Sequence, residues 1–167
     1  MEHDGRRRWL EEALNRYEEC LLRMCYSYLG DRSLAEDAVQ ETFLKAWKSY
    51  GHFRGESSEK TWLMCIAINT CRDVCRGAWF KHIDPTVSLD QLDDRAVSFE
   101  PRDDAVTKAV MNLKPRLREA VLLRWYQGLS ADETAQALGI SRSTAYERLS
   151  KAQAMLKSEL EEWHDEV

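Results

Sequence analysis

Six side chains near the end of the chain have the types and the spacing needed to recognise duplex DNA. They lie on one predicted helix and are Arg142, Ser143, Tyr146, Glu147, Arg148 and Lys151. Arginine and lysine neutralise phosphates, and a carboxylate accepts a hydrogen bond from the exocyclic amine of cytosine. A tyrosine ring can pack against a sugar or a thymine methyl group. The chemistry predicted here is therefore noncovalent: phosphate binding with base selection by Glu147.

The segment that positions these side chains, Leu129 to Leu156, has the pattern of a helix-turn-helix, whose second helix enters the major groove. Ser130 and Glu133 form an S-x-x-E capping box at the start of its first helix. Gly139 suits the left-handed residue that ends that helix, and Ser141 can cap the second. The second helix has an apolar face of Ala145, Leu149, Ala152 and Leu156. An ordinary pair of surface helices is the alternative interpretation.

A second set of polar side chains suits single-stranded nucleic acid. At about 100° per residue, six side chains share one face of a helix predicted from about Ser57 to Trp79. They are Trp62, Cys65, Asn69, Arg72, Asp73 and Arg76. The ring can stack on a base, the amide can bind a base edge, and the arginines can bind phosphates. A solvated face with one half-buried tryptophan explains the spacing equally well, so both interpretations stay open.

The rest of the sequence predicts an all-α protein. Its 7 glycines and 3 prolines are few, and the apolar residues recur with a helical period. A first helix is predicted from about Arg8 to Leu29. A second begins near Ser33, where Ser33 and Glu36 form a capping box, and ends near Tyr50.

Residues 81–104 lose this periodicity and contain both Pro85 and Pro101. Between 83 and 104 there are seven acidic residues against two basic ones. A connection of this length is uncommon inside a compact domain. We therefore predict two small helical domains, 1–80 and 105–167, that move independently about a flexible acidic linker, 81–104. In the second domain, a short helix over 105–113 and one starting at Pro115 precede the helix-turn-helix.

The net charge of -5 argues on its face against a nucleic-acid ligand, but the charges are unevenly distributed. Residues 105–160 carry nine basic and five acidic residues. Mild positive charge in a helix-turn-helix block fits weak binding to free DNA. There is no signal peptide and no apolar run long enough to cross a bilayer, so a cytoplasmic protein is expected.

Several other functional classes find little support. Of the five cysteines, Cys71 and Cys75 lie one helical turn apart, but no C-x-x-C pair occurs. Closed zinc sites usually need two such ligand pairs, so we expect no metal and no cofactor. The sequence has no glycine-rich phosphate loop, no H-E-x-x-H motif and no nucleophile elbow. We therefore expect a binding protein and not an enzyme.

Three signatures in this order resemble the extracytoplasmic-function group of bacterial RNA polymerase sigma factors, within the sigma-70 family. The segment from Asp37 to Trp47 resembles the family's polymerase-binding helix. Residues 53–58, followed by Thr61-Trp62-Leu63 and 66–69, resemble its promoter-melting loop and helix. The helix-turn-helix is the third signature, and the resemblance covers about residues 17–157. Four positions depart from the pattern. Glu59 replaces a usually apolar or aromatic residue, Tyr146 and Glu147 occupy positions that are commonly basic or small, and Gln153 replaces a frequent arginine.

The resemblance implies a role for each signature. The first domain would bind the clamp helices of core RNA polymerase through Asp37, Gln40, Glu41 and Leu44. Minus-ten DNA would be opened and held by Arg54, Trp62, Asn69, Arg72 and Arg76, with Asn69 in the pocket of a flipped base and Trp62 beside it. The minus-35 element would be bound by Arg142, Ser143, Tyr146, Glu147, Arg148 and Lys151. An anti-sigma factor is a further implied partner.

The main alternative function is a stand-alone helix-turn-helix regulator that does not engage polymerase. The pattern from Asp37 to Trp47 discriminates between the two functions, because such a regulator has no use for a polymerase-binding helix. The interpretation favoured by the sequence is a specificity subunit of RNA polymerase with no chemistry of its own.

Overall fold

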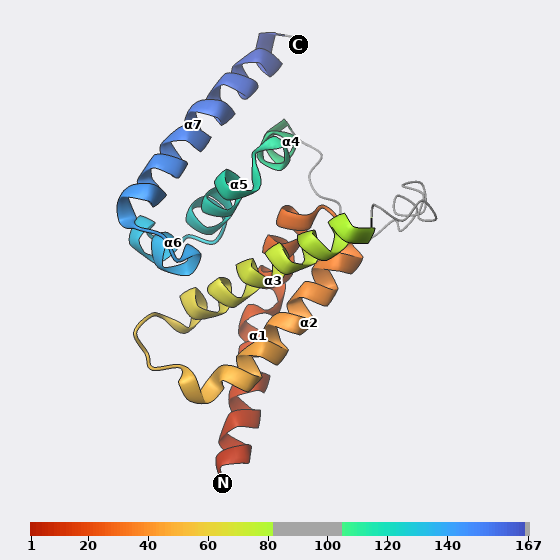
Figure 1. The fold of residues 1–167 in the computed structure, drawn as a ribbon, viewed down its shortest axis with the longest axis vertical. Helices are drawn as coiled ribbons and strands as arrows, with labels where there is room; N and C mark the ends of the chain where they lie inside the picture. The colour runs from red at the N-terminus through yellow and green to blue at the C-terminus, as the bar shows by residue number, and fades with distance from the viewer. Residues whose placement is uncertain (82–104, 166–167) are drawn as a thin grey trace.

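The computed structural model describes residues 1–81 and 105–165, and every regular element in these ranges is helical (Figure 1). The prediction of an all-α protein is confirmed. A first block contains α1 (Glu2–Leu29), α2 (Arg32–Ser49), the short 3-10 turn η1 (Tyr50–His52) and α3 (Glu59–Lys81). A second block contains α4 (Ala105–Asn112), α5 (Pro115–Val121), the π-helical turn η3 (Leu122–Tyr126), α6 (Ala131–Leu138) and α7 (Arg142–Asp165).

The corner between α1 and α2 is set by two consecutive residues. Gly30 ends α1 in the left-handed conformation, with φ at 71°. The side chain of Asp31 then caps α2 by accepting a hydrogen bond from the backbone N–H of Leu34 at 2.9 Å. The predicted capping box of Ser33 and Glu36 is therefore wrong, because Ser33 already lies inside α2. The first helix also starts earlier than predicted, at Glu2.

The third helix begins at Glu59, two residues later than predicted. Ser58 is its cap, because the Ser58 hydroxyl accepts a hydrogen bond from the backbone N–H of Thr61 at 3.1 Å. Before it, the chain leaves η1 and turns through Gly55, whose φ is 72°. This loop is the one predicted to take part in promoter melting, and most of its side chains are exposed.

The two blocks pack against each other in this structure (Figure 1). Helix α3 lies between α1 and α2 on one side and α6 on another. The helical period predicts a core face of Leu63, Ile66, Ala67, Thr70 and Val74 on this helix. Leu63, Ala67 and Thr70 are buried, whereas Ile66 and Val74 are only partly buried. Met64, Ile68 and Cys71 are also fully buried, and the periodicity missed them because α3 has neighbours on more than one face. The described residues end at Lys81 and resume at Ala105, so the predicted linker lies outside them and independent domain movement stays a prediction.

The local predictions for the helix-turn-helix are confirmed. The Ser130 hydroxyl accepts from the backbone N–H of Glu133 at 3.1 Å, and the Glu133 carboxylate accepts from the backbone N–H of Ser130 at 3.1 Å. Gly139 ends α6 with φ at 67°. The Ser141 hydroxyl accepts from the backbone N–H of Thr144 at 3.2 Å and so caps α7. The predicted apolar face is buried at Ala145, Leu149 and Ala152, and Leu156 is partly buried.

Replacing the cap of α6 should measurably destabilise the chain. We expect Ser130→Ala to lower the free energy of unfolding by about 1 kcal/mol, because the Glu133 N–H loses its acceptor. Ser130→Gly is the matched control and should lose only a few tenths of a kcal/mol. Urea unfolding at neutral pH measures both changes, and equal stability of all three chains would show that the cap contributes nothing.

The same capping box gives the stability a pH dependence. The backbone N–H of Ser130 holds the pKa of Glu133 below its ordinary value of 4.5. The charged carboxylate therefore stabilises the folded chain above that value, and the contribution is lost as the pH falls through the lowered pKa. In Glu133→Gln this part of the acid dependence should be absent.

Candidate polymerase and nucleic-acid interfaces

The four side chains predicted to bind polymerase lie on one exposed face of α2. Asp37, Gln40 and Glu41 are exposed, and Leu44 keeps 52% of its surface exposed. Their neighbour Glu36 is paired with Arg32 at 2.8 Å, whereas no such pair involves Asp37 or Glu41 within the described residues. The carboxylates of Asp37 and Glu41 are thus available to a basic partner, beside an apolar side chain.

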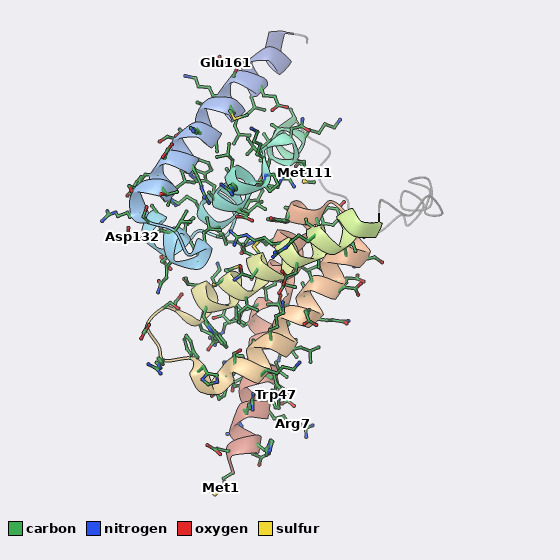
Figure 2. All side chains as sticks on the ribbon, in the orientation of Figure 1. Met1, Arg7, Trp47, Met111, Asp132 and Glu161 are labelled. Carbon is green, nitrogen blue, oxygen red and sulfur yellow. The ribbon has the colours of Figure 1, made fainter. Side chains whose placement is uncertain are left out.

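An apolar groove borders this face between α1 and α2. It encloses about 430 Å³ and is lined by Leu10, Leu14, Glu18, Val39, Gln40, Phe43, Leu44 and Trp47. The helical period predicts Leu10 and Leu14 in a buried apolar stripe of the first helix, so the sequence interpretation missed the contribution of α1 to this groove. Leu10, Leu14 and Glu18 follow one another at intervals of one helical turn, and this spacing could have shown that they share one face of α1. In Figure 2, Trp47 lies at the N-terminal end of the molecule, far from Glu161 at the other end.

An aromatic cluster lies under the loop that precedes α3. The rings of Phe53 and Trp62 are 4.8 Å apart, and Trp9 lies 4.7 Å from Tyr50 and 6.0 Å from Trp62, all measured between ring centroids. The indole N–H of Trp9 donates to a Glu59 carboxylate oxygen at 3.1 Å. Trp62 is therefore half-buried among other rings.

The predicted minus-ten side chains are only partly brought together. Arg72 Nη1 donates to the side-chain oxygen of Asn69 at 3.2 Å, so these two are neighbours on α3. Asn69 is exposed, and Arg76 pairs with Asp73 at 2.7 Å one turn further on. Arg54 is exposed in the loop, and no hydrogen bond or ion pair among the described residues joins it to this group. The structure thus brings Asn69 and Arg72 together, and their binding to nucleic acid stays a prediction.

Arg72 is engaged by the second block in this arrangement. Its Nε and Nη2 donate to the two oxygens of Glu119 on α5, each at 2.7 Å. The Tyr28 hydroxyl donates to the same Glu119 carboxylate at 2.7 Å. Glu119 is only 2% exposed, so α1, α3 and α5 meet at one buried carboxylate. The sequence interpretation missed this residue because nothing local distinguishes it from a surface glutamate on a short helix.

The pKa shifts of Arg72, Tyr28 and Arg118 are consistent with these buried contacts. The hydrogen bonds that Arg72 donates to Glu119 raise the pKa of Arg72 above its ordinary value, so the guanidinium stays charged. Burial raises the pKa of Tyr28, and Glu119 raises it further, so its hydroxyl stays a donor. Burial lowers the pKa of Arg118, whose guanidinium donates to the backbone oxygens of Tyr28, Met111 and Leu113.

The start of α3 also contacts the second block. The Lys60 ammonium donates to the backbone oxygen of Gln127 at 2.6 Å, and the Thr61 hydroxyl donates to Glu133 at 3.1 Å. The Gln127 amide returns a hydrogen bond to the backbone oxygen of Cys20 at 3.2 Å. Polar contacts therefore join the two blocks on both sides of the shared apolar core.

The predicted minus-35 side chains lie on the first turns of α7, where Arg142, Ser143, Tyr146, Glu147 and Lys151 are exposed and Arg148 is half-buried. Arg142 pairs with Asp132 at 2.9 Å and lies over the Tyr146 ring, 5.7 Å from its centroid. The Lys151 ammonium is 3.5 Å from the Glu147 carboxylate. Exposed pairs of this kind are worth only about 0.2–0.5 kcal/mol, so DNA can displace the lysine.

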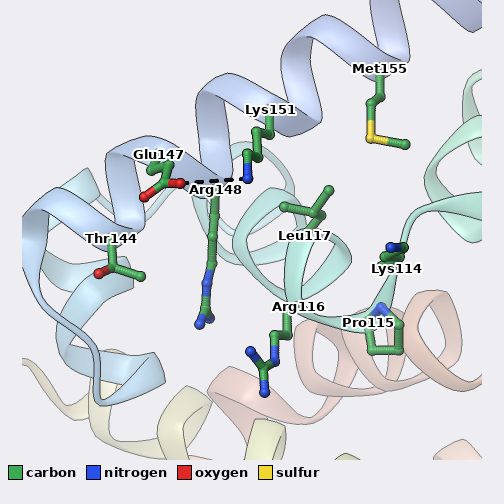
Figure 3. Close-up of a pocket in the computed structure, with 9 residues that line it drawn as sticks. All are labelled: Lys114, Pro115, Arg116, Leu117, Thr144, Glu147, Arg148, Lys151 and Met155. Atoms are coloured by element: carbon green, nitrogen blue, oxygen red, sulfur yellow. Dashed lines mark ion pairs between the residues drawn. The ribbon is translucent and has the colours of Figure 1, made fainter.

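A cleft of about 650 Å³ separates this face of α7 from the start of α5 (Figure 3). It is lined by Lys114, Pro115, Arg116, Leu117, Thr144, Glu147, Arg148, Lys151 and Met155. Four of these side chains are basic and one is acidic. The sequence interpretation missed Lys114 and Arg116, because it used Pro115 between them only as a helix start. The two basic residues that flank Pro115 could have indicated a second positively charged surface near the helix-turn-helix.

Across residues 1–81 and 105–165, no three His, Cys, Asp or Glu side chains are grouped so that they could hold a metal ion. No helix in these ranges has the length and apolar character needed to cross a membrane.

Two family models match the chain, one on each block. The model described as sigma-70 region 2 matches residues 13–81, and that described as sigma-70, region 4 matches residues 103–156. The first of these ranges includes the predicted polymerase face and minus-ten surface. The second includes the helix-turn-helix and the cleft beside it.

Curated relatives carry the same description. The ECF RNA polymerase sigma factor SigG of Mycobacterium tuberculosis is 34% identical over 85% of this chain, and the chain spans about half of that relative, 46%. The ECF RNA polymerase sigma factor SigX of Bacillus subtilis is 30% identical, with 90% of this chain and 83% of the relative covered. The sigma-H factor of Pseudomonas aeruginosa is 28% identical, with 94% and 89% covered.

Solved structures agree in fold. The sigma factor RpoE of Bartonella quintana, solved with the anti-sigma factor NepR, superposes with a TM-score of 0.75 at 26% identity. That match covers 90% of this chain and 96% of the other. CnrH, solved with the cytosolic domain of CnrY, superposes with a TM-score of 0.69 at 23% identity and shows the fold alone.

Proposed function

Because the chain belongs to the extracytoplasmic-function sigma factors of the sigma-70 family, we propose that it binds core RNA polymerase and directs transcription from specific promoters. One observation carries the proposal. The chain joins an exposed face of α2, bordered by an apolar groove, to an intact helix-turn-helix with an exposed polar face. A specificity subunit needs both surfaces, because it must bring one macromolecule to the other. We place this activity in the cytoplasm.

The first block would supply the polymerase contact and the opening of the minus-ten element. Asp37, Gln40 and Glu41 would face basic side chains of polymerase, while Leu44 and the adjacent groove would bury apolar ones. Asn69 and Arg72 would hold an unstacked base and its phosphate, with Trp62 beside them. Arg54 and Arg76, which lie at opposite ends of this surface, would bind the flanking backbone.

The second block would bind the minus-35 element as duplex DNA. The exposed start of α7 fits the major groove, where base edges are distinguishable. Arg142, Arg148 and Lys151 would hold phosphates, and Tyr146 would pack on sugar or a thymine methyl. Ser143 and Glu147 would meet base edges. The basic side chains across the cleft, Lys114 and Arg116, would add phosphate contacts from α5.

We also propose that the chain has an anti-sigma partner. Support comes from its likeness to a sigma factor solved together with an anti-sigma factor. The closed arrangement also supports it, since Arg72 is bound to Glu119 and is not available to DNA while the blocks are packed together. A partner that favours this arrangement would keep the minus-ten surface covered.

A stand-alone helix-turn-helix regulator remains the second candidate function. It would explain α6 and α7 but not the exposed acidic and apolar face of α2. The decisive experiment is transcription from a genomic fragment library with purified core polymerase, with and without the chain, read by sequencing RNA start sites. We expect new start sites that share upstream elements. If the chain binds such DNA but yields no new starts, the regulator is the better description.

Glu147 should contribute to base choice within the minus-35 element. A good base contact is worth about 1–3 kcal/mol of discrimination, more than the exposed pair with Lys151. Glu147→Ala should therefore relax the preference at one position without abolishing binding. Binding-site selection with the unmutated chain and the variant measures this. Identical selected sequences would leave Glu147 as a surface residue paired with Lys151.

A further inference from the structure

We propose that Trp9 is a positioning residue for promoter opening. Its ring and its hydrogen bond to Glu59 hold the two ends of the loop over residues 53–58, and through Trp62 they orient the minus-ten surface. The inference rests on the proposed function and extends it to the first turns of α1. The matched family region begins only at residue 13, so Trp9 lies outside it.

Trp9 contacts the chain immediately before and immediately after the loop. On the near side its ring lies 4.7 Å from that of Tyr50, which starts the turn leading into the loop. On the far side its indole N–H binds Glu59, the first residue of α3, at 3.1 Å. The Trp62 ring lies 6.0 Å from the Trp9 ring and 4.8 Å from the Phe53 ring, measured between centroids, so Phe53 is linked to Trp9 through Trp62. One side chain therefore spans both ends of the loop.

The loop has little else to fix its position. Arg54, Gly55 and Glu56 are exposed, and an added Cβ at Gly55 would meet nothing within 4 Å. A loop with few contacts takes its average position from its ends. Placement of these ends matters for opening, because an unstacked base must be met by prearranged side chains.

Two other contacts hold the start of α3, but both lead to the second block. Lys60 binds the backbone oxygen of Gln127, and Thr61 binds Glu133. Both contacts would be lost if the two blocks moved apart, as the two-domain prediction expects. The bond between Trp9 and Glu59 lies entirely within the first block, so it persists. With the blocks apart, it would still join the start of α3 to α1.

Glu59 is itself a departure from the family pattern, which usually has an apolar side chain at this position. A carboxylate in the first turn of a helix is favourable by itself. It also gives the indole N–H of Trp9 an acceptor, which an apolar side chain cannot do. The tryptophan and the glutamate therefore form a matched pair across fifty residues of sequence.

The test compares five single variants and one double variant in the complex with core polymerase. Trp9→Phe keeps a ring without the donor, and Trp9→Ala removes both. Glu59→Leu removes the acceptor, whereas Glu59→Gln retains one. Arg7→Ala is the matched control, because Arg7 is exposed on the same helix and, among the described residues, forms an ion pair only with Glu11. Each is assayed for core affinity and for the rate of opening of a promoter found by the transcription experiment, reported by 2-aminopurine in the minus-ten element.

We expect Trp9→Phe and Glu59→Leu each to slow opening about two- to tenfold, the range of one hydrogen bond. Trp9→Ala should slow it further, and Glu59→Gln and Arg7→Ala should open like the unmutated chain. The affinity of every variant for core polymerase should stay within about twofold of that of the unmutated chain. This is a smaller change than the loss of one hydrogen bond would cause. The double variant, Trp9→Phe with Glu59→Leu, should slow opening no more than either substitution alone, because both remove the same hydrogen bond.

Two results would overturn the inference. Unchanged opening in Trp9→Ala would show that the loop needs no support from α1. Parallel loss of core affinity and opening in Trp9→Phe and Glu59→Leu would show a general structural role. Failure of the proposed function looks different, because the unmutated chain would then open no promoter at all.

Discussion

Reversing the charges of Asp37 and Glu41 together should weaken binding to core polymerase about 100-fold, since like charges across an interface cost several kcal/mol. Both carboxylates are exposed one helical turn apart on α2, beside Leu44 and the apolar groove. Neither supports the fold through an ion pair in the described part of the chain. The double variant, Asp37→Arg with Glu41→Arg, should therefore fold normally while presenting the wrong charge to a basic surface.

The control for this variant makes the same change of net charge elsewhere. Glu11→Arg with Glu19→Arg replaces two exposed carboxylates on α1, each in an exposed helical pair. Core affinity is measured for both double variants at two salt concentrations, with circular dichroism to confirm folding. Equal weakening by the two would indicate only general electrostatics. Unchanged affinity of a folded Asp37→Arg, Glu41→Arg chain would rule out this face of α2.

Local signals in the sequence were sufficient for the helix-turn-helix. Ser130 with Glu133, Gly139 and Ser141 act within one or two helical turns, so their spacing alone predicts which backbone groups they bind. The same reasoning gave the wrong cap at Ser33, because Asp31 is the residue that caps α2. The extended backbone of Asp31 places its carboxylate over the first turn of the helix. Two acceptors close in sequence can be ranked only when the turn before them is known.

The contacts that organise the candidate site are between residues far apart in the sequence, and the pattern could not predict them. Trp9 and Glu59 have no periodic relation to each other, and neither do Tyr28, Arg72 and Glu119. Helical periodicity reports one buried face per helix, whereas α3 is covered on several. Arg72 was predicted on the polar face of α3, but its ion pair with Glu119 could not be predicted because it requires the packing of α5 against α3.

The buried carboxylate of Glu119 leads to the other large expected effect, which concerns the closed arrangement of the two blocks. Glu119→Ala removes the acceptor of the Tyr28 hydroxyl and both hydrogen bonds from Arg72. Breaking a buried pair by removing one partner costs about 3–5 kcal/mol, and we expect the lower end because Arg72 keeps some exposure to water. The blocks should then separate more readily, and Arg72 should become available to DNA.

Three measurements test this expectation on the free chain. Small-angle scattering should show a larger radius of gyration for Glu119→Ala, thermal unfolding should begin at a lower temperature, and affinity for single-stranded minus-ten DNA should rise. Tyr28→Phe is the milder variant, because it removes one hydrogen bond worth about 1 kcal/mol and leaves the pair with Arg72 intact. If Glu119→Ala loosens the chain but DNA affinity rises neither in it nor in Tyr28→Phe, the contact is purely structural. If DNA affinity rises in step with the radius, Glu119 and promoter DNA compete for Arg72, and opening of the blocks is a step that must precede capture of the minus-ten strand.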